Sequence, residues 1–400
     1  MQSSAKIAVV SQHYPPDSST TAAIMAAIAN HLAAEAAVLV LSGTPGSASH
    51  ESNEPGKPAV VEIRNRIPQK AALVRRALAE SLFSLRVFAA LLRRLQRHDV
   101  VLTVTAPFML PYAVAAAARL KRARSVLIMH DLFPDVLIMA GLLRQRSILA
   151  RVMRGANALM FRALDAIVII GRDTEALLMR YRGVTPEKIS FIPNWATLEP
   201  GVRPIEPDNP YRRLHAARFM VGLSGNLGFT HDPDVVFDAA QLLRDDSHIH
   251  FLLSGWGIGF DRLKELQSNA GLPNVTLVDR VAEEGLEAFL AAANVWLIPY
   301  RREFAGVSVP SRFYNLLAVG RPVILVSESN AEAALTVSEQ DLGWVVEPGH
   351  PELLAQTIRL AALREDSARA ERAAVTAHQF NFAAAMAGYS GLIARLLRQR

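Results

Sequence analysis

Short apolar runs rich in β-branched residues alternate with longer amphipathic stretches along the first 200 residues. The runs are typical of buried strands, and the stretches between them space their apolar residues as one face of a helix does. The predicted strands are residues 7–10, 38–41, 100–104, 125–129, 166–170 and 189–192. The predicted helices are residues 22–34, 81–96, 111–120, 147–164 and 174–181. This alternation predicts a doubly wound α/β domain around a parallel sheet.

The same alternation returns after a proline-rich interruption. Residues 195–211 hold Pro200, Pro204, Pro207 and Pro210, which is typical of a loop between domains. The strands predicted beyond it are residues 219–224, 250–253, 275–277, 295–298, 322–326 and 343–346. The tail, residues 367–400, is predicted to be helical throughout.

The predicted fold class is therefore α/β, with two doubly wound Rossmann-like domains facing a central cleft. We expect residues 1–200 to form the first domain and residues 201–380 the second. Residues 381–400 are expected to form a helix that packs back on the first domain. Open parallel sheets bind ligands beyond the carboxyl ends of their strands, so a site is expected in the strand-to-helix loops.

Composition excludes several function classes. The 400 residues are 51% hydrophobic, which is enough for the cores of two or three domains and excludes a disordered or fibrous chain. The absence of cysteine excludes disulfides, thiolate metal sites and a thiol nucleophile. We find no signal-peptide pattern and no uncharged apolar run long enough to cross a membrane. We therefore expect a cytoplasmic protein whose contact with the membrane is peripheral.

The positive charge is concentrated in the first half of the chain. Residues 1–200 hold 24 Lys and Arg against 14 Asp and Glu, whereas residues 201–400 hold 19 against 23. A basic half indicates an anionic partner. Residues 73–98 have the pattern of a basic amphipathic helix, and residues 141–165 are a second basic stretch. The predicted membrane-facing residues are Arg75, Arg76, Arg93, Arg94 and Arg97. The alternative is that both stretches are ordinary surface helices.

Three loops of the second half follow predicted strands. Gly225 and Gly228 punctuate the first, which precedes a helix at residues 233–243, so it is a candidate diphosphate cradle or an ordinary tight turn. The second loop, residues 253–259, is glycine-rich. The third places Arg312 in the first turn of a helix, where its charge opposes the helix dipole, so it marks either an anion site or a solvated surface.

Two loops of the first half carry polar side chains at strand ends. His130 and Asp131 follow one buried strand, where an imidazole can polarise a substrate oxygen, although backbone can also satisfy it. Residues 13–21 follow another strand and offer Tyr14, Ser18, Ser19 and Thr20 to a phosphate or an acceptor, while Asp17 or Ser18 as a helix cap is the simpler account. No nucleophile elbow, zinc motif or Asp-x-Asp pattern occurs at a strand end, so hydrolase and metalloenzyme functions are disfavoured.

Taken together, these loops resemble those of the retaining, nucleotide-sugar-dependent glycosyltransferases of the large bacterial family 4, which have the two-domain GT-B fold. The resemblance covers nearly the whole chain and is greatest to enzymes that build lipid-linked polysaccharide or O-antigen units. It rests on the motifs His13-Tyr-Pro-Pro16, His130-Asp-Leu-Phe-Pro134, Ile192-Pro-Asn-Trp195, Ser224-Gly-Asn-Leu-Gly228, Val309-Pro-Ser-Arg-Phe-Tyr314 and Gly320-Arg-Pro-Val323.

The resemblance implies transfer of a sugar from a nucleotide sugar, with UDP-sugar expected, to a polyprenyl-diphosphate-linked or saccharide acceptor with retention of configuration. It implies no resident cofactor, no metal, no nucleic acid, and an anionic membrane surface as partner. The catalytic residues it implies are His130, Arg312 and Asp131. The donor-binding residues it implies are Gly225, Asn226, Gly228, His231, Gly255, Gly306, Val307, Ser308, Ser311, Tyr314 and Asn315.

The chain departs from the family pattern at the donor side. Asn226 and His231 stand where many relatives have Arg and Lys, so Arg312 and a protonated His231 are the remaining candidates for stabilising the diphosphate charge. Asn315 replaces a Glu that holds ribose hydroxyls, and Ala305, with Glu303 nearby, replaces an earlier Glu. An epimerase or hydrolase with the same fold is the nearest alternative function, and a nucleic-acid-binding protein is a more distant one.

Overall fold

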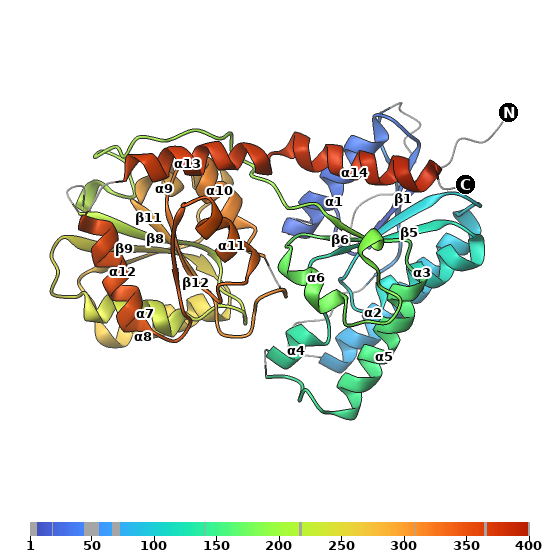
Figure 1. Ribbon diagram of the computed structural model, residues 1–400, viewed down its shortest axis with the longest axis horizontal. Helices are drawn as coiled ribbons and strands as arrows, with labels where there is room; N and C mark the ends of the chain where they lie inside the picture. The colour runs from blue at the N-terminus through green and yellow to red at the C-terminus, as the bar shows by residue number, and fades with distance from the viewer. Residues whose placement is uncertain are drawn as a thin grey trace.

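The computed structural model describes residues 6–17, 19–43, 56–65, 73–139, 141–215, 218–307, 309–363 and 366–398. Its strands form two separate sheets, and every strand pairs in parallel with its neighbours (Figure 1). Each sheet is covered by helices on both faces, so its strands are apolar along their whole length, as parallel strands generally are. The predicted α/β fold of two doubly wound, Rossmann-like domains is confirmed.

The first sheet has the strand order β3-β2-β1-β4-β5-β6-β7. Its strands are β1 (Ile7–Ser11), β2 (Val38–Ser42), β3 (Ala59–Glu62), β4 (Val100–Val104), β5 (Arg124–Met129), β6 (Ala166–Ile169) and β7 (Ile189–Phe191). The helices between them are α1 (Thr20–Ala33), α2 (Leu73–Arg94), α3 (Leu110–Lys121), α4 (Asp135–Met139), α5 (Ile148–Ala163) and α6 (Asp173–Leu178). The sequence pattern did not predict β3 or α4.

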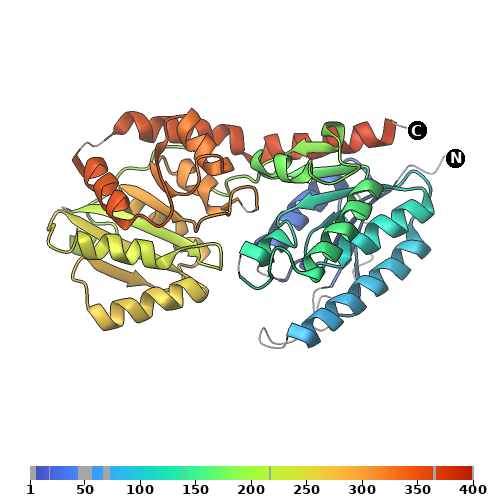
Figure 2. The same ribbon diagram turned by 60° about the horizontal axis from the view of Figure 1, so that its bottom comes forward.

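The helices divide between the two faces of this sheet. On one face, α1 packs with Ile28 and Met25 against Val9 and its neighbours in the sheet. On the other face, α2 and α3 pack side by side, and α5 lies next to α3 over β5 and β6 (Figure 2). The exposed sides of α2 and α5 therefore belong to the same layer of helices.

The second sheet has the strand order β10-β9-β8-β11-β12-β13. Its strands are β8 (Phe219–Asn226), β9 (Ile249–Trp256), β10 (Val275–Val278), β11 (Val295–Pro299), β12 (Val323–Val326) and β13 (Gly343–Val346). Its helices are α7 (Pro233–Leu242), α8 (Ile258–Ala270), α9 (Glu283–Ala292), α10 (Arg312–Ala318), α11 (Glu332–Glu339), α12 (Pro351–Leu363) and α13 (Ser367–Ala377). In both sheets the strand order reverses near β1 or β8, which opens a crevice at the carboxyl ends of the strands.

The last helix, α14 (Phe382–Arg398), lies against the first sheet rather than the second (Figure 1). Met386 and Tyr389 are buried with residues of α1 and β1, and Ser390 Oγ is 3.0 Å from His31 Nε2. The tail is not helical throughout, as the sequence had indicated, because Asn381 is extended and its side chain accepts a hydrogen bond from the backbone N–H of Ala384. This break lets the chain change direction between the two domains.

No helix among the described residues is long and apolar enough to cross a membrane. Arg75, Arg93, Arg94 and Arg97 are exposed along and just beyond α2. The side chain of Arg76 lies outside the part of the chain that the structure describes. The membrane role of these arginines stays a prediction.

Candidate active site at the facing sheet edges

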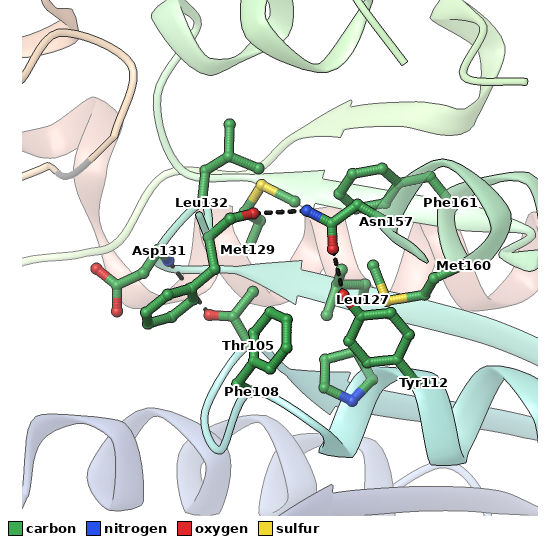
Figure 3. Close-up of a pocket in the computed structure, with 12 residues that line it drawn as sticks. Thr105, Phe108, Tyr112, Leu127, Met129, Asp131, Leu132, Asn157, Met160 and Phe161 are labelled. Atoms are coloured by element: carbon green, nitrogen blue, oxygen red, sulfur yellow. Dashed lines mark hydrogen bonds between the residues drawn. The ribbon is translucent and has the colours of Figure 1, made fainter. Parts of the chain in front are cut away.

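His130 and Asp131 lie at the carboxyl edge of the first sheet, directly after β5. The hydroxyl of Thr105, which follows β4, accepts a hydrogen bond of 3.3 Å from the backbone N–H of His130. It also accepts one of 3.2 Å from the backbone N–H of Asp131 (Figure 3). Two neighbouring strands thus fix the backbone of the residues that the sequence singled out.

Burial changes the charge state of both side chains. The His130 Nε2 atom is buried and has no hydrogen-bond partner among the described residues, and burial lowers the pKa of the ring to about 4. Burial also raises the pKa of Asp131 to about 6. At neutral pH the imidazole is therefore neutral, with one ring nitrogen available to a substrate hydroxyl.

A small apolar pocket lies beneath this loop (Figure 3). Phe108, Tyr112 and Asn157 are among the residues that line it, and its volume is about 20 Å³. Asn157 accepts a hydrogen bond from the Tyr112 hydroxyl and donates one to the carbonyl of Phe133. A space of this size holds about one water molecule, so the pocket supports the loop and does not bind a sugar.

The carboxyl ends of β8 and β9 approach each other closely at the second sheet. Gly225 pairs with Gly255, and a Cβ atom on Gly255 would lie 2.3 Å from the carbonyl oxygen of Gly225. Gly225 also has a φ of +123°, a conformation that favours glycine. Asn226 is exposed at the end of β8, and Gly228 follows it in the loop. Gly225 and Gly255 are therefore required by the close approach of the two strands, and their predicted role in donor binding stays a prediction.

Two guanidinium groups share the indole of Trp256. The guanidinium carbon of Arg312 is 5.2 Å and that of Arg280 is 4.5 Å from the ring centre. Arg312 Nη1 donates a hydrogen bond of 2.9 Å to Ser224 Oγ. Burial, and then the charge of Arg280, lower the pKa of Arg312. Among the described residues neither arginine is paired with a carboxylate, so this cluster holds two positive charges without a counter-ion.

The sequence interpretation missed Arg280 and Trp256. Arg280 comes two residues after β10, in a strand-to-helix loop of the kind that was searched, and Trp256 ends β9. Both belong to the cluster because Arg280, beyond β10, lies on the ring of Trp256, at the end of β9, and this contact exists only in the folded chain.

The expectation of a protonated His231 is wrong. Burial and the charge of Arg301 lower the pKa of His231 to about 4, so its ring is neutral at pH 7. The ring stacks on Tyr300 with centres 4.9 Å apart, and Nδ1 lies 2.9 Å from the hydroxyl of Thr230. His231 shapes the loop, whereas Arg280 supplies the second positive charge.

Asn315, for which the sequence predicted a ribose contact, makes its hydrogen bonds to the segment between the domains. Asn315 Oδ1 accepts hydrogen bonds from the backbone N–H groups of Thr197 at 2.7 Å and Leu198 at 3.3 Å, and Nδ2 donates to the Thr197 hydroxyl at 3.0 Å. The amide therefore fastens the chain between the domains, and its oxygen and one of its two N–H donors are used in doing so. The side chain of Tyr314 is 1% exposed and packs on Phe380, so it does not face a ligand.

The loop after β1 contributes less than predicted. Tyr14 belongs to the core, and the hydroxyl of Ser19 accepts a hydrogen bond from the backbone N–H of Ala22 as the cap of α1. The cap is therefore Ser19 rather than Asp17 or Ser18, and the buried Tyr14 is not open to an acceptor. Thr20 is exposed in the first turn of α1. Ser18, like Ser308 of the other candidate loop, lies outside the described residues.

The loop around Gly306 in the second domain is held by the first domain. Asp173 Oδ2 accepts hydrogen bonds from the backbone N–H groups of Gly306 at 2.7 Å and Glu332 at 2.9 Å. Thr174 Oγ1 donates to the carbonyl of Gly306 at 3.0 Å. Gly306 thus contacts α6, and Val307 is buried. Their predicted role in donor binding stays a prediction. Ser311 is exposed at the start of α10.

An ion-pair network continues this contact between the domains. Arg172 Nε lies 3.0 Å from Oε2 of the buried Glu332, and Arg172 Nη2 lies 3.1 Å from Oε2 of Glu339. No pattern in the sequence predicts this network, because Arg172 and Glu332 are 160 residues apart and meet only in the folded chain. Glu303, considered in place of a family Glu, is exposed with a φ of +68°, and its backbone N–H donates to the Glu328 carboxylate.

No cluster of three or more His, Asp or Glu side chains within the described ranges could hold a metal ion.

Known structures share this two-sheet arrangement along the whole chain. A sucrose-phosphate synthase from Thermosynechococcus elongatus superposes with a TM-score of 0.76 at 16% identity, covering 99% of this chain and all of that one. Anabaena HepE in complex with UDP-glucose superposes with a TM-score of 0.66 at 17% identity, covering 99% and all of the two chains. These matches establish the GT-B fold.

Sequence comparisons define the family. Residues 22–199 match the model of Glycosyltransferase Family 4, and residues 218–362 match that of Glycosyl transferases group 1. WbjE of Pseudomonas aeruginosa, named as a probable glycosyltransferase, is 30% identical over 292 residues, which is 72% of each chain. WcaI of Escherichia coli (strain K12), named for colanic acid biosynthesis and glycosyl transfer, is 26% identical over 325 residues, or 79% of each chain. The chain belongs to the GT-B glycosyltransferases, with a family 4 first domain and a group 1 second domain.

Proposed function

We propose that the protein transfers a sugar, with retention of configuration, from a nucleoside diphosphate sugar to a lipid-linked or saccharide acceptor in the biosynthesis of cell-surface polysaccharide. The observation that carries this proposal is the pair of arginines, Arg280 and Arg312, that meet on Trp256 and have no carboxylate partner among the described residues. Two adjacent positive charges at a partly desolvated edge repel each other and are stabilised by a bound dianion such as a diphosphate. The UDP-glucose held by HepE and the name of WcaI support the same reading.

The chemistry that this edge serves is cleavage of the bond between the anomeric carbon and the diphosphate. The bonding electron pair leaves with the diphosphate, and the acceptor oxygen forms the new bond to the anomeric carbon on the same face. The acceptor proton then passes to the departing phosphate oxygen. Arg312 and Arg280 stabilise the negative charge that develops on the leaving group. The transfer thus uses no resident cofactor or metal, because side-chain cations supply the charge, and a UDP-sugar is the proposed donor.

His130 is placed to bind the sugar or the acceptor hydroxyl. Its buried, unpartnered Nε2 gains a hydrogen bond when a hydroxyl approaches, and its neutral ring avoids repelling the cation-like transition state. Asp131 follows His130 directly, and because burial raises its pKa to about 6, its carboxyl group can change its protonation state near neutral pH. The contact of Asp173 with the Gly306 loop brings the two edges together and keeps water from the reacting carbon.

We also propose that the protein works at the cytoplasmic face of an anionic membrane. The exposed side of α2 presents Leu78, Leu82 and Leu85 beside arginines, a mixture that suits a lipid surface. Co-sedimentation with phosphatidylglycerol vesicles should fall when Arg93, Arg94 and Arg97 are changed to Gln. Unchanged binding would leave α2 with a packing role only.

A thermal-shift panel of UDP-, GDP- and ADP-sugars, followed by a transfer assay, tests the main proposal. We expect one donor class to stabilise the wild-type protein, and His130→Ala and Arg312→Ala to abolish transfer while both variants remain folded. Rapid isomerisation or hydrolysis of the donor without any acceptor would favour an epimerase or hydrolase instead. A salt-sensitive gel shift would favour nucleic-acid binding.

A further inference from the structure

A polar cavity lies outside the facing edges, between α4, α5 and α6 of the first domain. Its volume is about 460 Å³, which is ample for a diphosphate. Arg154, Arg180 and Arg182 line it, and Asp135 is the one acidic side chain among the described residues that do so. Asp135 Oδ1 is 3.1 Å from Arg154 Nη2. Arg180 and Arg182 are exposed and have no carboxylate partner among the described residues. The cavity therefore carries a net positive charge.

The cavity borders the loop that carries the candidate catalytic residues. Leu132 and Asp135 belong to its lining, and they follow His130 by two and five positions. A phosphate group bound here would accordingly lie beside the His130 loop, with the remainder of its molecule free to extend toward the facing edges. Figure 1 shows α4 on the side of the first domain that faces the second.

An exposed apolar row runs along α5 beside the cavity. Ile148, Val152 and Leu159 are spaced to share one face of the helix and are 75%, 61% and 72% exposed. The exposed side chains of Arg151 and Arg162 flank the row. Three large aliphatic side chains on one solvent-facing row are unfavourable in water and indicate an apolar partner.

Gly155 joins the row to the cavity. It lies on the exposed face between Val152 and Leu159 and also lines the cavity. Glycine is a poor choice inside an exposed helix, and here neither a left-handed φ nor any neighbour requires it, because a Cβ atom would meet nothing within 4 Å. Its missing side chain leaves an open passage between a basic cavity and an apolar surface.

We propose that this passage binds the lipid diphosphate of the acceptor, with the diphosphate on Arg154, Arg180 and Arg182 and the prenyl chain along Ile148, Val152 and Leu159. The adjoining basic and apolar surfaces match the two halves of such a molecule, and the positive charge matches its head group. This inference rests on the proposed function, because it names the acceptor that the His130 edge would receive.

Direct binding of farnesyl diphosphate to the full chain, below its micelle concentration, tests the site. We expect the wild-type protein to bind it at least tenfold more tightly than inorganic diphosphate. The double variant Arg180→Gln/Arg182→Gln should lose at least tenfold in affinity for both. The matched control Arg144→Gln/Arg146→Gln removes two nearby exposed charges that do not line the cavity, and it should change neither affinity by more than twofold.

Gly155 separates lipid binding from plain anion binding. Gly155→Gln places a neutral side chain in the passage and suits a helix, so the variant should fold. It should bind inorganic diphosphate as the wild type does and farnesyl diphosphate at least fivefold more weakly. The site would be overturned if Arg144→Gln/Arg146→Gln lost as much affinity as Arg180→Gln/Arg182→Gln. It would also be overturned if the wild type did not bind farnesyl diphosphate more tightly than inorganic diphosphate.

The outcomes also separate this inference from the proposed function. Sugar transfer to a prenyl-diphosphate-linked acceptor with an unchanged Michaelis constant for that acceptor in Arg180→Gln/Arg182→Gln would refute the site and leave the transferase assignment intact. If farnesyl diphosphate bound through these arginines but the protein transferred no sugar, the site would stand and the transferase assignment would be refuted. Phosphatidylglycerol vesicles that bind through the same two arginines as tightly as the prenyl compound would show a general membrane contact and contradict the proposal.

Discussion

Asp173 Oδ2 accepts a hydrogen bond of 2.7 Å from the backbone N–H of Gly306, so a carboxylate of the first domain fixes a loop of the second. The same oxygen accepts the N–H of Glu332, and Arg172 pairs with the Glu332 carboxylate. These contacts tie the two sheet edges together next to the clustered arginines. The proposed catalytic geometry would therefore depend on how closely the two domains dock as well as on the residues proposed to contact substrate.

Gly306→Ala tests this docking. A Cβ atom at Gly306 would lie 2.8 Å from Leu177 Cδ1 and 2.9 Å from the carbonyl of Asp173, and the φ of +78° adds strain. We expect a loss of about 1–3 kcal/mol in the free energy of unfolding and at least a tenfold fall in kcat. Chemical denaturation and steady-state kinetics measure the two effects.

Gly271→Ala is the matched control for backbone strain. Gly271 also has a positive φ, of +59°, but a Cβ atom there would meet nothing within 4 Å. It should lose about 1 kcal/mol of stability and keep its kcat. Equal falls in kcat for the two variants would contradict a role for the Gly306 contact.

Asp131 gives stability an unusual pH dependence. Because burial raises its pKa from 3.8 to about 6, the native state binds more protons than the unfolded chain between these pH values, and this group's contribution to stability falls as pH rises. Asp131→Asn should therefore stabilise the protein by about 1–3 kcal/mol at pH 7.5 and change it little at pH 3.5. Urea denaturation at the two pH values measures the difference.

His130 should show the opposite slope. Burial lowers its pKa from 6.5 to about 4, so the unfolded chain binds more protons in that window and this contribution to stability is lost as pH falls. The free energy of unfolding of His130→Gln, relative to that of the wild type, should consequently be higher at pH 4.5 than at pH 7.5. The same slope in both variants would mean that one of the two side chains is exposed to water.

Asn315 is expected to affect stability far more than donor recognition. Asn315→Leu leaves the part-buried hydrogen bonds of the Thr197 and Leu198 N–H groups without their acceptor and should cost about 2–4 kcal/mol. Asn315→Asp keeps that acceptor and should cost about 1 kcal/mol. Calorimetry gives both values. If Asn315→Asp instead weakened donor binding tenfold without loss of stability, the result would indicate that Asn315 contacts the nucleotide directly.

Arg280 should contribute to donor binding almost as much as Arg312. Because both guanidiniums lie on Trp256, we expect Arg280→Gln and Trp256→Leu each to raise the dissociation constant of UDP by about tenfold, and Arg312→Gln by more. Lys264→Gln is the control, since Lys264 lies on Phe260 and pairs with Asp279 instead. Isothermal titration at two salt concentrations separates a direct contact from a general field, which salt screens.

The sequence predicted the sheets well because parallel strands are buried on both faces and carry continuous β-branched runs. It missed β3, whose short apolar run lies half-buried at the sheet edge. His130 and Asp131 were found because a buried strand ends just before them. By contrast, the stacking of Arg280 on Trp256 and the contact of Asp173 with Gly306 depend on how separate loops meet in space. Asn315 shows the limit of a family pattern, since a changed residue type took on a different structural task.

The measurement that most directly tests the central claim is the time course of the reaction with a UDP-sugar and a prenyl-diphosphate-linked sugar acceptor, followed by NMR at the anomeric position. We predict a new glycosidic linkage of the same anomeric configuration as the donor, formed only when the acceptor is present and lost in Arg312→Ala and His130→Ala. A linkage of inverted configuration, or release of free sugar without transfer, would contradict the account.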